Sequence, residues 1–407
     1  MDAINEQTFS KTRPARLIAI ANRINLQAGV SEQSFAAELE RIVDMAVPHL
    51  AQDRPNLVVL GEILGLPLAL AGRRGYLPRL MHTSNVAISM LALAYARRIL
   101  YYRRRYSGIS LVRALLLSLS DIMYRPFVTT LSQLAGKHAI YLSASTIAPH
   151  VRRSTSEREI RRLGQRQANE VYLPNGPGVY NTGFLWGPDG RLIGTSDKVF
   201  LTSNELSILD LTPGDLDSVH PFDSEIGKVG IANSLDAFTP EYLRTLDNQG
   251  TCIVIQNDAN DQPWAAPSHT GEWQPQEWLN SVLGCLQDDY PNLHYNICTM
   301  QRGNFFDLVF DGQSTITKKS ECEPNPSCNF VGNEGFMHTV TGKPMKGEIL
   351  ALSPWVVEDP RWTNPHLSLA ERRTALEQVT RQLSPGGARA NQYPESVIWA
   401  DIDVPVA

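Results

Sequence analysis

Short apolar runs alternate with longer amphipathic segments along most of the chain. The runs have the length and continuity of buried strands. They cover residues 16–20, 56–60, 139–145, 228–232, 252–256, 295–300 and 397–402. Segments with apolar residues at helical spacing lie between them, at 31–50, 127–138, 239–249, 276–287 and 368–383. Because strands and helices alternate, the pattern predicts an α/β or layered α+β fold.

Residues 180–195 have the pattern of a β-hairpin. Two strand-like runs, 180–186 and 192–195, flank the sequence Gly-Pro-Asp-Gly, which is a strong turn signal. The mixed-charge segment 152–166 has no such pattern, and we expect a solvated loop or helix there.

The composition excludes several classes of protein. With 407 residues, 43% of them hydrophobic, the chain can bury a sizeable core and is neither disordered nor collagen-like. The five cysteines are odd in number and form no Cys-x-x-Cys pair, so we expect neither a disulfide framework nor a bound metal. A polar N-terminus and the lack of an apolar run of about 18 residues predict no signal peptide and no spanning helix. These features favour a cytoplasmic protein.

The charge is distributed unevenly. Between Arg73 and Arg125 there are ten arginines and one acid, Asp121, which give this stretch a net charge of +9. The rest of the chain, with 27 basic and 41 acidic residues, carries −14. The stretch also holds two apolar runs, and Ile109, Val112, Leu116 and Leu119 share one helical face.

Two interpretations of this basic stretch stay open. In the first, it is an inserted helical hairpin that packs on the body of the protein or on a second subunit, with Arg103, Arg104 and Arg105 at the rim of the interface near the pocket entrance. In the second, its arginines from Arg97 to Arg105 contact anionic lipid at a membrane surface. Nothing else in the sequence supports a nucleic-acid partner, because the overall net charge is −5.

Three segments carry candidate catalytic residues. The first, NLVVLGE, ends at Glu62; the second, YNTGFLWGPDGRLIGTSDKVFLTSNE, contains Lys198 and ends at Glu205; the third, GKVGIANSLDAFTPEYLRTL, contains Ser234. In this order and spacing they resemble the motifs of the nitrilase superfamily of carbon–nitrogen hydrolases. The resemblance covers residues 15 to about 318 and the closing strand near Val397.

The resemblance implies a catalytic set. In that family a Glu acts as the base, a Lys neutralises the developing oxyanion, and a Cys attacks. Glu62 and Lys198 occupy the first two positions. The Cys lies in the motif G-x-x-x-C-x-D-x-x-F-P-E, which this chain matches at Gly230, Asp236, Pro240 and Glu241, with Thr239 in place of Phe and Ser234 in place of Cys.

The serine puts the activity in question. A serine hydroxyl is far less acidic than a thiol and needs a closely aligned base, and no histidine near Ser234 in the sequence supplies one. Either Ser234 is an engineered substitution, or the chain is a natural member with lost or altered chemistry; the polar Asn233 beside it favours the second. We expect Glu205 to orient Lys198 or the substrate, and Asp236 to bind backbone near the nucleophile.

The resemblance also implies an organisation and a function. The fold would be a four-layer α-β-β-α sandwich, formed by one domain over residues 15–405 with a basic helical insertion at 66–126 and a C-terminal extension at 319–396. The chain would form a homodimer or larger homo-oligomer and cleave a small amide or nitrile through an acyl-enzyme, without a cofactor. One alternative is a catalytically impaired member that acts as a binding or scaffold protein.

A second alternative is a membrane-peripheral N-acyltransferase-like enzyme. The sequence Gln-Asn-Asp-Ala at 256–259, followed by Trp264, resembles a segment of the acyltransferase branch of the same superfamily. That branch carries spanning helices, which the pattern of this chain does not predict.

Overall fold

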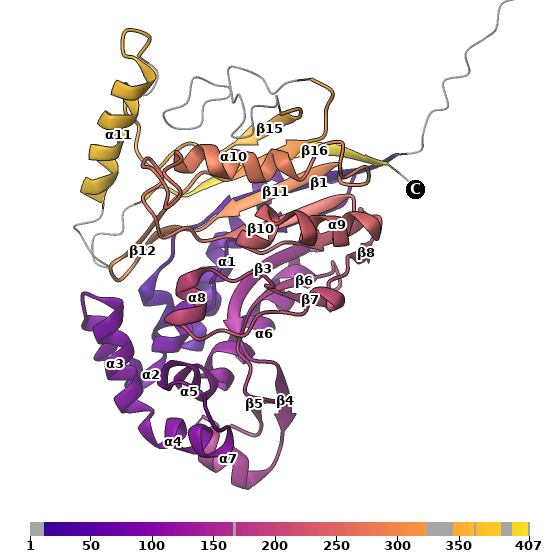
Figure 1. Cartoon of the computed structure of the whole chain (residues 1–407). Coiled ribbons are helices and arrows are strands. Elements are labelled where there is room, and N and C mark those ends of the chain that lie inside the picture. The colour runs from indigo at the N-terminus through magenta and orange to yellow at the C-terminus, as the bar shows by residue number, and fades with distance from the viewer. Residues whose placement is uncertain (1–11, 166–167, 323–344, 362–363, 384–392, 406–407) are drawn as a thin grey trace, which may run out of the picture.

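Two six-stranded sheets stack face to face in the centre of the molecule (Figure 1). The computed structural model describes residues 12–165, 168–322, 345–361, 364–383 and 393–405. The first sheet has the order β16 (Ser396–Pro405), β1 (Thr12–Ala21), β2 (Asn56–Val59), β3 (Tyr141–Ala148), β6 (Tyr180–Trp186) and β7 (Leu192–Asp197). The second has the order β15 (Glu348–Leu352), β14 (Thr315–Lys318), β11 (Tyr295–Met300), β10 (Ile253–Asp258), β9 (Gly227–Ile231) and β8 (Phe222–Ser224).

The alternation of side chains along β1 explains why both of its faces are buried. Ala15, Leu17 and Ala19 belong to the apolar cluster between the sheets, whereas Ile18 and Ile20 face the helical layer outside. Successive side chains of a strand point to opposite faces, so a continuous apolar run is required where both faces are covered.

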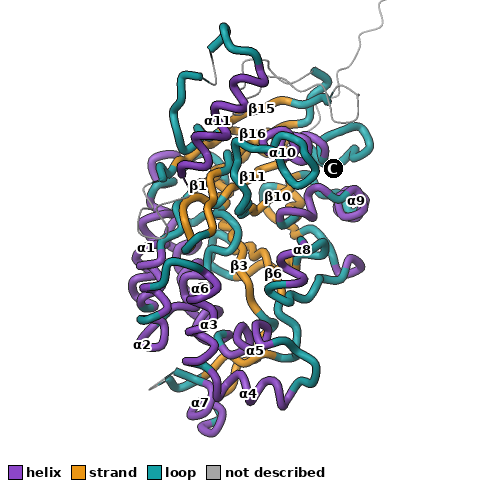
Figure 2. Tube along the Cα trace, turned by 60° about the vertical axis from the view of Figure 1, so that its left-hand side comes forward, coloured by secondary structure: helices purple, strands orange, loops and turns teal. Residues whose placement is uncertain are grey.

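Helices cover the outer face of each sheet. On the first sheet, α1 (Glu32–Asp44) and α6 (Ser120–His138) pack their apolar faces onto the strands. On the second, α9 (Pro240–Asn248) and α10 (Gln274–Gly284) do the same, and α11 (Leu369–Leu383) lies beyond α10, on the side away from α9 (Figures 1 and 2). The predicted layered α-β-β-α sandwich is therefore confirmed.

The basic stretch between β2 and β3 folds as a series of helices. They are a 3-10 helix (Leu66–Leu70), α2 (Gly72–Gly75), a second 3-10 helix (Pro78–Leu80), α3 (Ser84–Ala94), α4 (Ala96–Arg105) and α5 (Leu111–Ser118). These helices lie at one end of the molecule, below the sheets in Figure 1. Of the four residues expected to share one helical face, Leu116 is buried within α5, Ile109 and Leu119 are buried on either side of that helix, and Val112 is half-buried.

Two sequence-based boundaries differ from the structure. The helix expected at 127–138 begins earlier, because α6 starts at Ser120 and contains Pro126. The expected end of the insertion at residue 126 therefore falls inside a helix. Segment 152–166 is not one loop or helix. It forms β4 (Val151–Ser154), which pairs with β5 (Val171–Pro174), followed by α7 (Glu157–Leu163).

The remaining elements complete the sandwich. They are α8 (Ser203–Ser207), β12 (Arg302–Phe305), β13 (Leu308–Asp311) and three short 3-10 helices (Leu26–Val30, Val47–His49 and Leu216–Ser218). In the C-terminal extension, β15 pairs antiparallel with β14, so this segment adds a strand to the second sheet. Much of the extension, including residues 323–344, lies outside the described residues.

Candidate active site

Glu62 lies just past the end of β2, where the two sheets face each other. Its backbone N–H donates to Asp258 O at 3.4 Å, and its Oε2 accepts from the backbone N–H of Ala259 at 2.8 Å. Both partners lie at the end of β10 in the opposite sheet. The side chain is 3% exposed, so the carboxylate is held at the junction between the sheets.

Lys198 follows the last residue of β7 and points into the same buried region. Its Nζ lies 3.3 Å from Glu62 Oε1 and 3.0 Å from Glu205 Oε1, and the residue is 1% exposed. Its backbone is fixed on both sides, because its N–H donates to Asn181 O and its carbonyl accepts from Gly214 N, each at 2.8 Å. The ammonium group is thus placed between two carboxylates.

Glu205 is held by the helix that contains it. In a capping box at the start of α8, Thr202 N donates to Glu205 Oε2 at 2.8 Å, and Glu205 N donates to Thr202 Oγ1 at 3.3 Å. This reciprocal arrangement satisfies two backbone donors and fixes the carboxylate. Glu205 therefore contacts Lys198 directly from a rigid position.

Asn181 belongs to this group, although the sequence analysis did not single it out. Its Nδ2 donates to Glu62 Oε1 at 2.5 Å and to Glu205 Oε1 at 2.9 Å. The signal was available in the sequence, since Asn181 is the second residue of the Tyr-Asn-Thr motif that begins β6. The hairpin pattern of residues 180–195 includes Asn181 but does not indicate that its side-chain amide joins the carboxylates of Glu62 and Glu205.

Ser234 lies beyond the end of β9 in an unusual backbone conformation. Its φ is +49°, a left-handed value that costs a non-glycine residue about 1 kcal/mol or more, and a 3-10 helix (Ser234–Phe238) begins there. Backbone strain of this kind clusters at functional sites. The residue is 9% exposed, and its hydroxyl makes no hydrogen bond to any residue that the structure describes.

Two neighbours of Ser234 connect it to the lysine segment. Asp236 accepts from the backbone N–H groups of Val199 and Phe200, the two residues after Lys198, at 3.1 and 2.8 Å. Asn233 donates from Nδ2 to Ser196 O at 3.2 Å. The structure therefore brings the Ser234 segment and the Lys198 segment to the same end of the sandwich.

Burial and charge set the protonation of these groups. Burial raises the pKa of Glu62 to about 7, and the Lys198 charge opposes it. Burial alone would lower the pKa of Lys198, but the carboxylates of Glu62 and Glu205 outweigh it and raise the pKa. For Glu205, burial is outweighed by the Lys198 charge and the pKa is lowered. Glu62 can therefore exchange a proton near neutral pH while Lys198 stays charged.

Asp236 is a buried carboxyl group with a different role. Burial raises its pKa to about 8, against the opposing effect of the backbone N–H groups that it accepts from. Its contacts are with backbone groups of the neighbouring segment rather than with Glu62 or Lys198. In this geometry it can hold segments together.

Among the described residues, Cys252 lies away from Glu62. In the part of the chain that the structure describes, no group of three His, Cys, Asp or Glu side chains could hold a metal ion. Cys252 lies before the start of β10 and donates to Lys228 O, at the opposite end of that strand from Ala259, which contacts Glu62. No described helix is long and apolar enough to cross a membrane.

Comparisons with known proteins give a family match for part of the chain. Residues 108–283, which include Lys198 and Ser234, match the family model described as Carbon-nitrogen hydrolase. No curated protein matches the sequence.

Solved structures similar to the chain include the following three. A carbon-nitrogen hydrolase from Helicobacter pylori G27 is 17% identical, with 76% of this chain and 83% of that chain covered and a TM-score of 0.46. A Saccharomyces cerevisiae member of branch 10 of the nitrilase superfamily is 18% identical over 76% and 83%, with a TM-score of 0.44. A mutant of the amidase from Nesterenkonia sp. AN1 is 17% identical over 90% and 99%, with a TM-score of 0.44. Residues 108–283 therefore match the carbon–nitrogen hydrolase family, and the three motifs stand in the order that resembles the nitrilase superfamily.

Proposed function

We propose that the chain hydrolyses a small amide or nitrile through an acyl ester on Ser234, with Glu62 as general base and Lys198 as the group that stabilises the oxyanion. The observation that carries this proposal is the buried contact between Lys198 Nζ and Glu62 Oε1, at 3.3 Å. A proton acceptor with a pKa near 7 beside a fixed positive charge is what acyl transfer requires.

For an amide, the first half of the reaction forms the acyl ester. The Ser234 hydroxyl oxygen attacks the carbonyl carbon while Glu62 takes the hydroxyl proton, and the negative charge that develops on the carbonyl oxygen is stabilised by Lys198. Glu62 then gives this proton to the substrate nitrogen. The C–N bond breaks, and ammonia or an amine leaves.

The second half releases the acid. Water attacks the ester carbonyl while Glu62 takes one of its protons, and Lys198 again faces the negative oxygen. The ester C–O bond breaks as Glu62 returns the proton to the Ser234 oxygen. The carboxylic acid leaves, and the enzyme returns to its starting state.

Asn181 and Glu205 support this cycle without touching the reacting atoms. Asn181 donates to both carboxylates, and Glu205 contacts Lys198 from its capped helix. Together they keep Glu62 and Lys198 in one orientation through both half-reactions. We therefore regard them as positioning residues.

A second candidate is a binding protein that retains the pocket of an enzyme. The observation in its favour is that the Ser234 hydroxyl makes no hydrogen bond to a described residue, so nothing activates it in this state. Catalytic hydrogen bonds often tighten only when substrate is bound, which keeps hydrolysis as the first proposal.

The acyltransferase alternative gains no support from the segment that suggested it. Asn257 Nδ2 donates to Leu60 O at 2.6 Å, and Asp258 O accepts from Glu62 N at 3.4 Å. These contacts give the segment a structural role beside Glu62, which any member with this site could require.

The experiment is hydrolysis of a panel of simple amides and nitriles by the natural chain and by its Ser234→Cys and Ser234→Ala variants. We expect Ser234→Cys to raise the rate by at least about 100-fold, because a thiol is the better nucleophile beside this base, and Ser234→Ala to abolish it. If the natural chain and Ser234→Cys are equally inert while both remain folded by circular dichroism, hydrolysis is contradicted and the binding function gains.

A further inference from the structure

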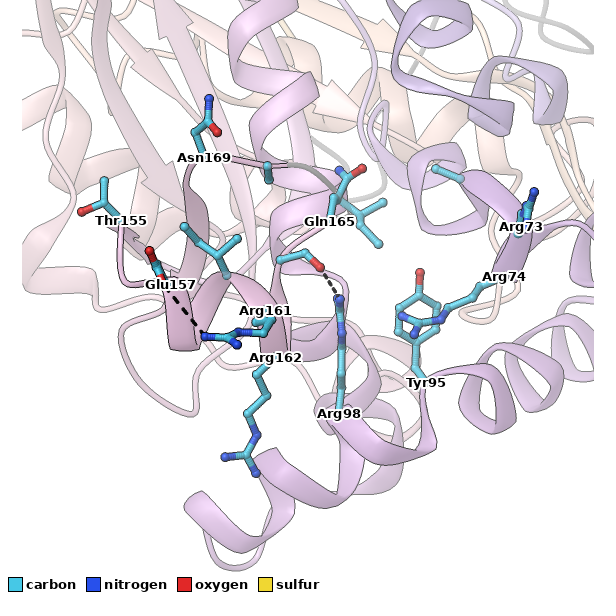
Figure 3. A pocket seen from close by; sticks show the side chains of 15 residues that line it. Arg73, Arg74, Tyr95, Arg98, Thr155, Glu157, Arg161, Arg162, Gln165 and Asn169 are labelled. Atoms are coloured by element: carbon cyan, nitrogen blue, oxygen red, sulfur yellow. Dashed lines mark hydrogen bonds and ion pairs between the residues drawn. The ribbon is translucent and has the colours of Figure 1, made fainter.

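A cavity of about 930 Å³ lies between the basic insertion and α7 (Figure 3). None of the candidate active-site residues lines it. Five arginines do so, and one carboxylate, Glu157, accompanies them, which gives the lining a net charge of +4. The arginines are Arg73, Arg74, Arg98, Arg161 and Arg162.

Arg74 and Arg98 converge on one aromatic ring of the cavity wall. The guanidinium carbon of Arg74 lies 4.8 Å from the centroid of the Tyr95 ring, and that of Arg98 lies 5.7 Å from it. Tyr95 is 2% exposed, so the ring is a fixed support rather than a surface side chain. In Figure 3 the Arg74 guanidinium reaches over this ring toward Arg98.

Among the described residues, no carboxylate contacts either guanidinium group directly, and the more distant charge of Asp121 favours the charged form of Arg98. Arg98 donates to two backbone carbonyls, Gly164 O at 2.7 Å and Ser118 O at 3.4 Å. Among the described residues, no carboxylate lies within ion-pair distance of Arg74 or Arg98. Burial and then the Arg74 charge lower the pKa of Arg98, so its charged form is destabilised here.

Other arginines of the same insertion are paired. Arg113 contacts Asp210 at 2.7 Å, and Arg125 contacts Glu32 at 2.6 Å. The fold can therefore supply contacting carboxylates to this stretch, and among the described residues none contacts Arg74 or Arg98. Arg98 is half-buried and Arg74 is exposed, and an anion bound between them would offset the repulsion between their two positive charges.

We propose that this cavity binds a small molecule with two or more phosphate groups, which lie between Arg74 and Arg98. Guanidinium groups match phosphate oxygens with paired hydrogen bonds, and charge-assisted bonds of this kind are stronger in a partly buried site. The volume suits a ligand of nucleotide size, which is larger than a single phosphate ion. The amides of Gln165 and Asn169 line the same cavity and can bind the uncharged part of such a ligand.

The test is isothermal titration calorimetry of the full chain at low salt with inorganic pyrophosphate, ATP and adenosine as probes. We expect ATP and pyrophosphate to bind and adenosine to bind at least about 100-fold more weakly, because several charge-assisted bonds are lost without the phosphates. If pyrophosphate and ATP bind with equal affinity, the phosphate groups alone supply the affinity. If ATP binds more tightly than pyrophosphate, the nucleoside adds to the affinity. Either result supports the proposal.

Matched variants locate the site. Arg74→Gln is expected to weaken ATP binding by about tenfold or more. Arg74→Lys should cause a smaller loss of affinity, because it keeps the positive charge but not the paired N–H donors of the guanidinium group. Arg97→Gln is the control, since Arg97 is an exposed arginine of α4 outside the cavity lining, and we expect less than a twofold change. Melting temperatures without ligand show whether each variant is folded.

Three results would overturn the proposal. The first is no binding of either phosphate compound at 1 mM. The second is an equal loss of affinity in folded Arg74→Gln and Arg97→Gln, which would indicate general attraction to a basic surface. The third is binding of RNA or anionic vesicles without any binding of pyrophosphate or ATP, which would assign the basic insertion to a macromolecular partner.

Discussion

The Lys198 ammonium nitrogen lies 3.3 Å from the Glu62 carboxylate, and both side chains are almost fully buried. Glu205 and Asn181 complete the contact, so each charged group has a partner. Removing one partner of a buried charge pair is strongly destabilising, because it leaves the other charge without compensation. The contact between Lys198 and Glu62 is therefore expected to contribute to the free energy of unfolding as well as to catalysis.

Lys198→Met is expected to lower the free energy of unfolding by about 3–5 kcal/mol, since Glu62 and Glu205 then face each other without a cation. The loss should be smaller at pH 5 than at pH 8, because protonation of a carboxylate removes the uncompensated charge. Urea denaturation at both pH values measures it. Lys137→Met is the control: Lys137 pairs with Glu40 at 2.7 Å with both side chains about half exposed, and a loss as large as that of Lys198→Met would refute this explanation.

Asn181→Ala is expected to shift the pH profile of hydrolysis. The hydrogen bond from Asn181 favours the ionised form of Glu62 and lowers its pKa, so its removal raises that pKa. The natural profile should rise with pH through about 7, as Glu62 ionises, and the variant should rise at higher pH and lose about tenfold in rate at pH 7. The measurement is kcat/KM from pH 5 to 9, with Ser234→Cys as the common background if the natural rate is too low.

Asn175→Ala provides the comparison for that experiment, because Asn175 is exposed and its side chain donates only to Val151 O among the described residues. Its pH profile should be unchanged. A uniform loss of rate in Asn181→Ala, with no movement along the pH axis, would mean that Asn181 has only a structural role.

The basic insertion is expected to form a subunit interface rather than a membrane contact. Leu77 and Leu93 are 54% and 78% exposed, and a second copy of the chain would cover such apolar side chains. Analytical ultracentrifugation should show that the chain forms a dimer or a larger oligomer. Leu93→Glu should shift the oligomeric state toward the monomer. Vesicle sedimentation tests the alternative: salt-sensitive binding to anionic vesicles that disappears when Arg103, Arg104 and Arg105 become Ala would favour the membrane.

The motifs allowed the family and the layered fold to be predicted, because each combines a strand end with a residue of specific chemistry. Glu62 follows an apolar run and Lys198 follows the second strand of a hairpin, and the ends of these strands meet at one edge of the sandwich. The contact of Lys198 with Glu205 also follows from short spacing along the chain. These are local signals that the sequence carries without any knowledge of packing.

Other features depend on long-range packing and could not be predicted. The amide of Asn181 bridges two carboxylates that lie 119 and 24 residues away in sequence. Pro126 is accommodated within α6, although proline in a sequence favours a helix end. The cavity that Arg74 and Arg98 line is formed by the insertion together with α7. It could not be predicted, because the sequence of segment 152–166 does not show where α7 lies.

The central claim is that Ser234 carries the acyl group. The most direct measurement is intact-protein mass spectrometry of the natural chain, quenched soon after mixing with an activated amide, followed by peptide mapping. We predict a mass increase equal to one acyl group, located on Ser234 and lost in Ser234→Ala. Turnover without an adduct on Ser234, or an adduct on a cysteine instead, would contradict the account.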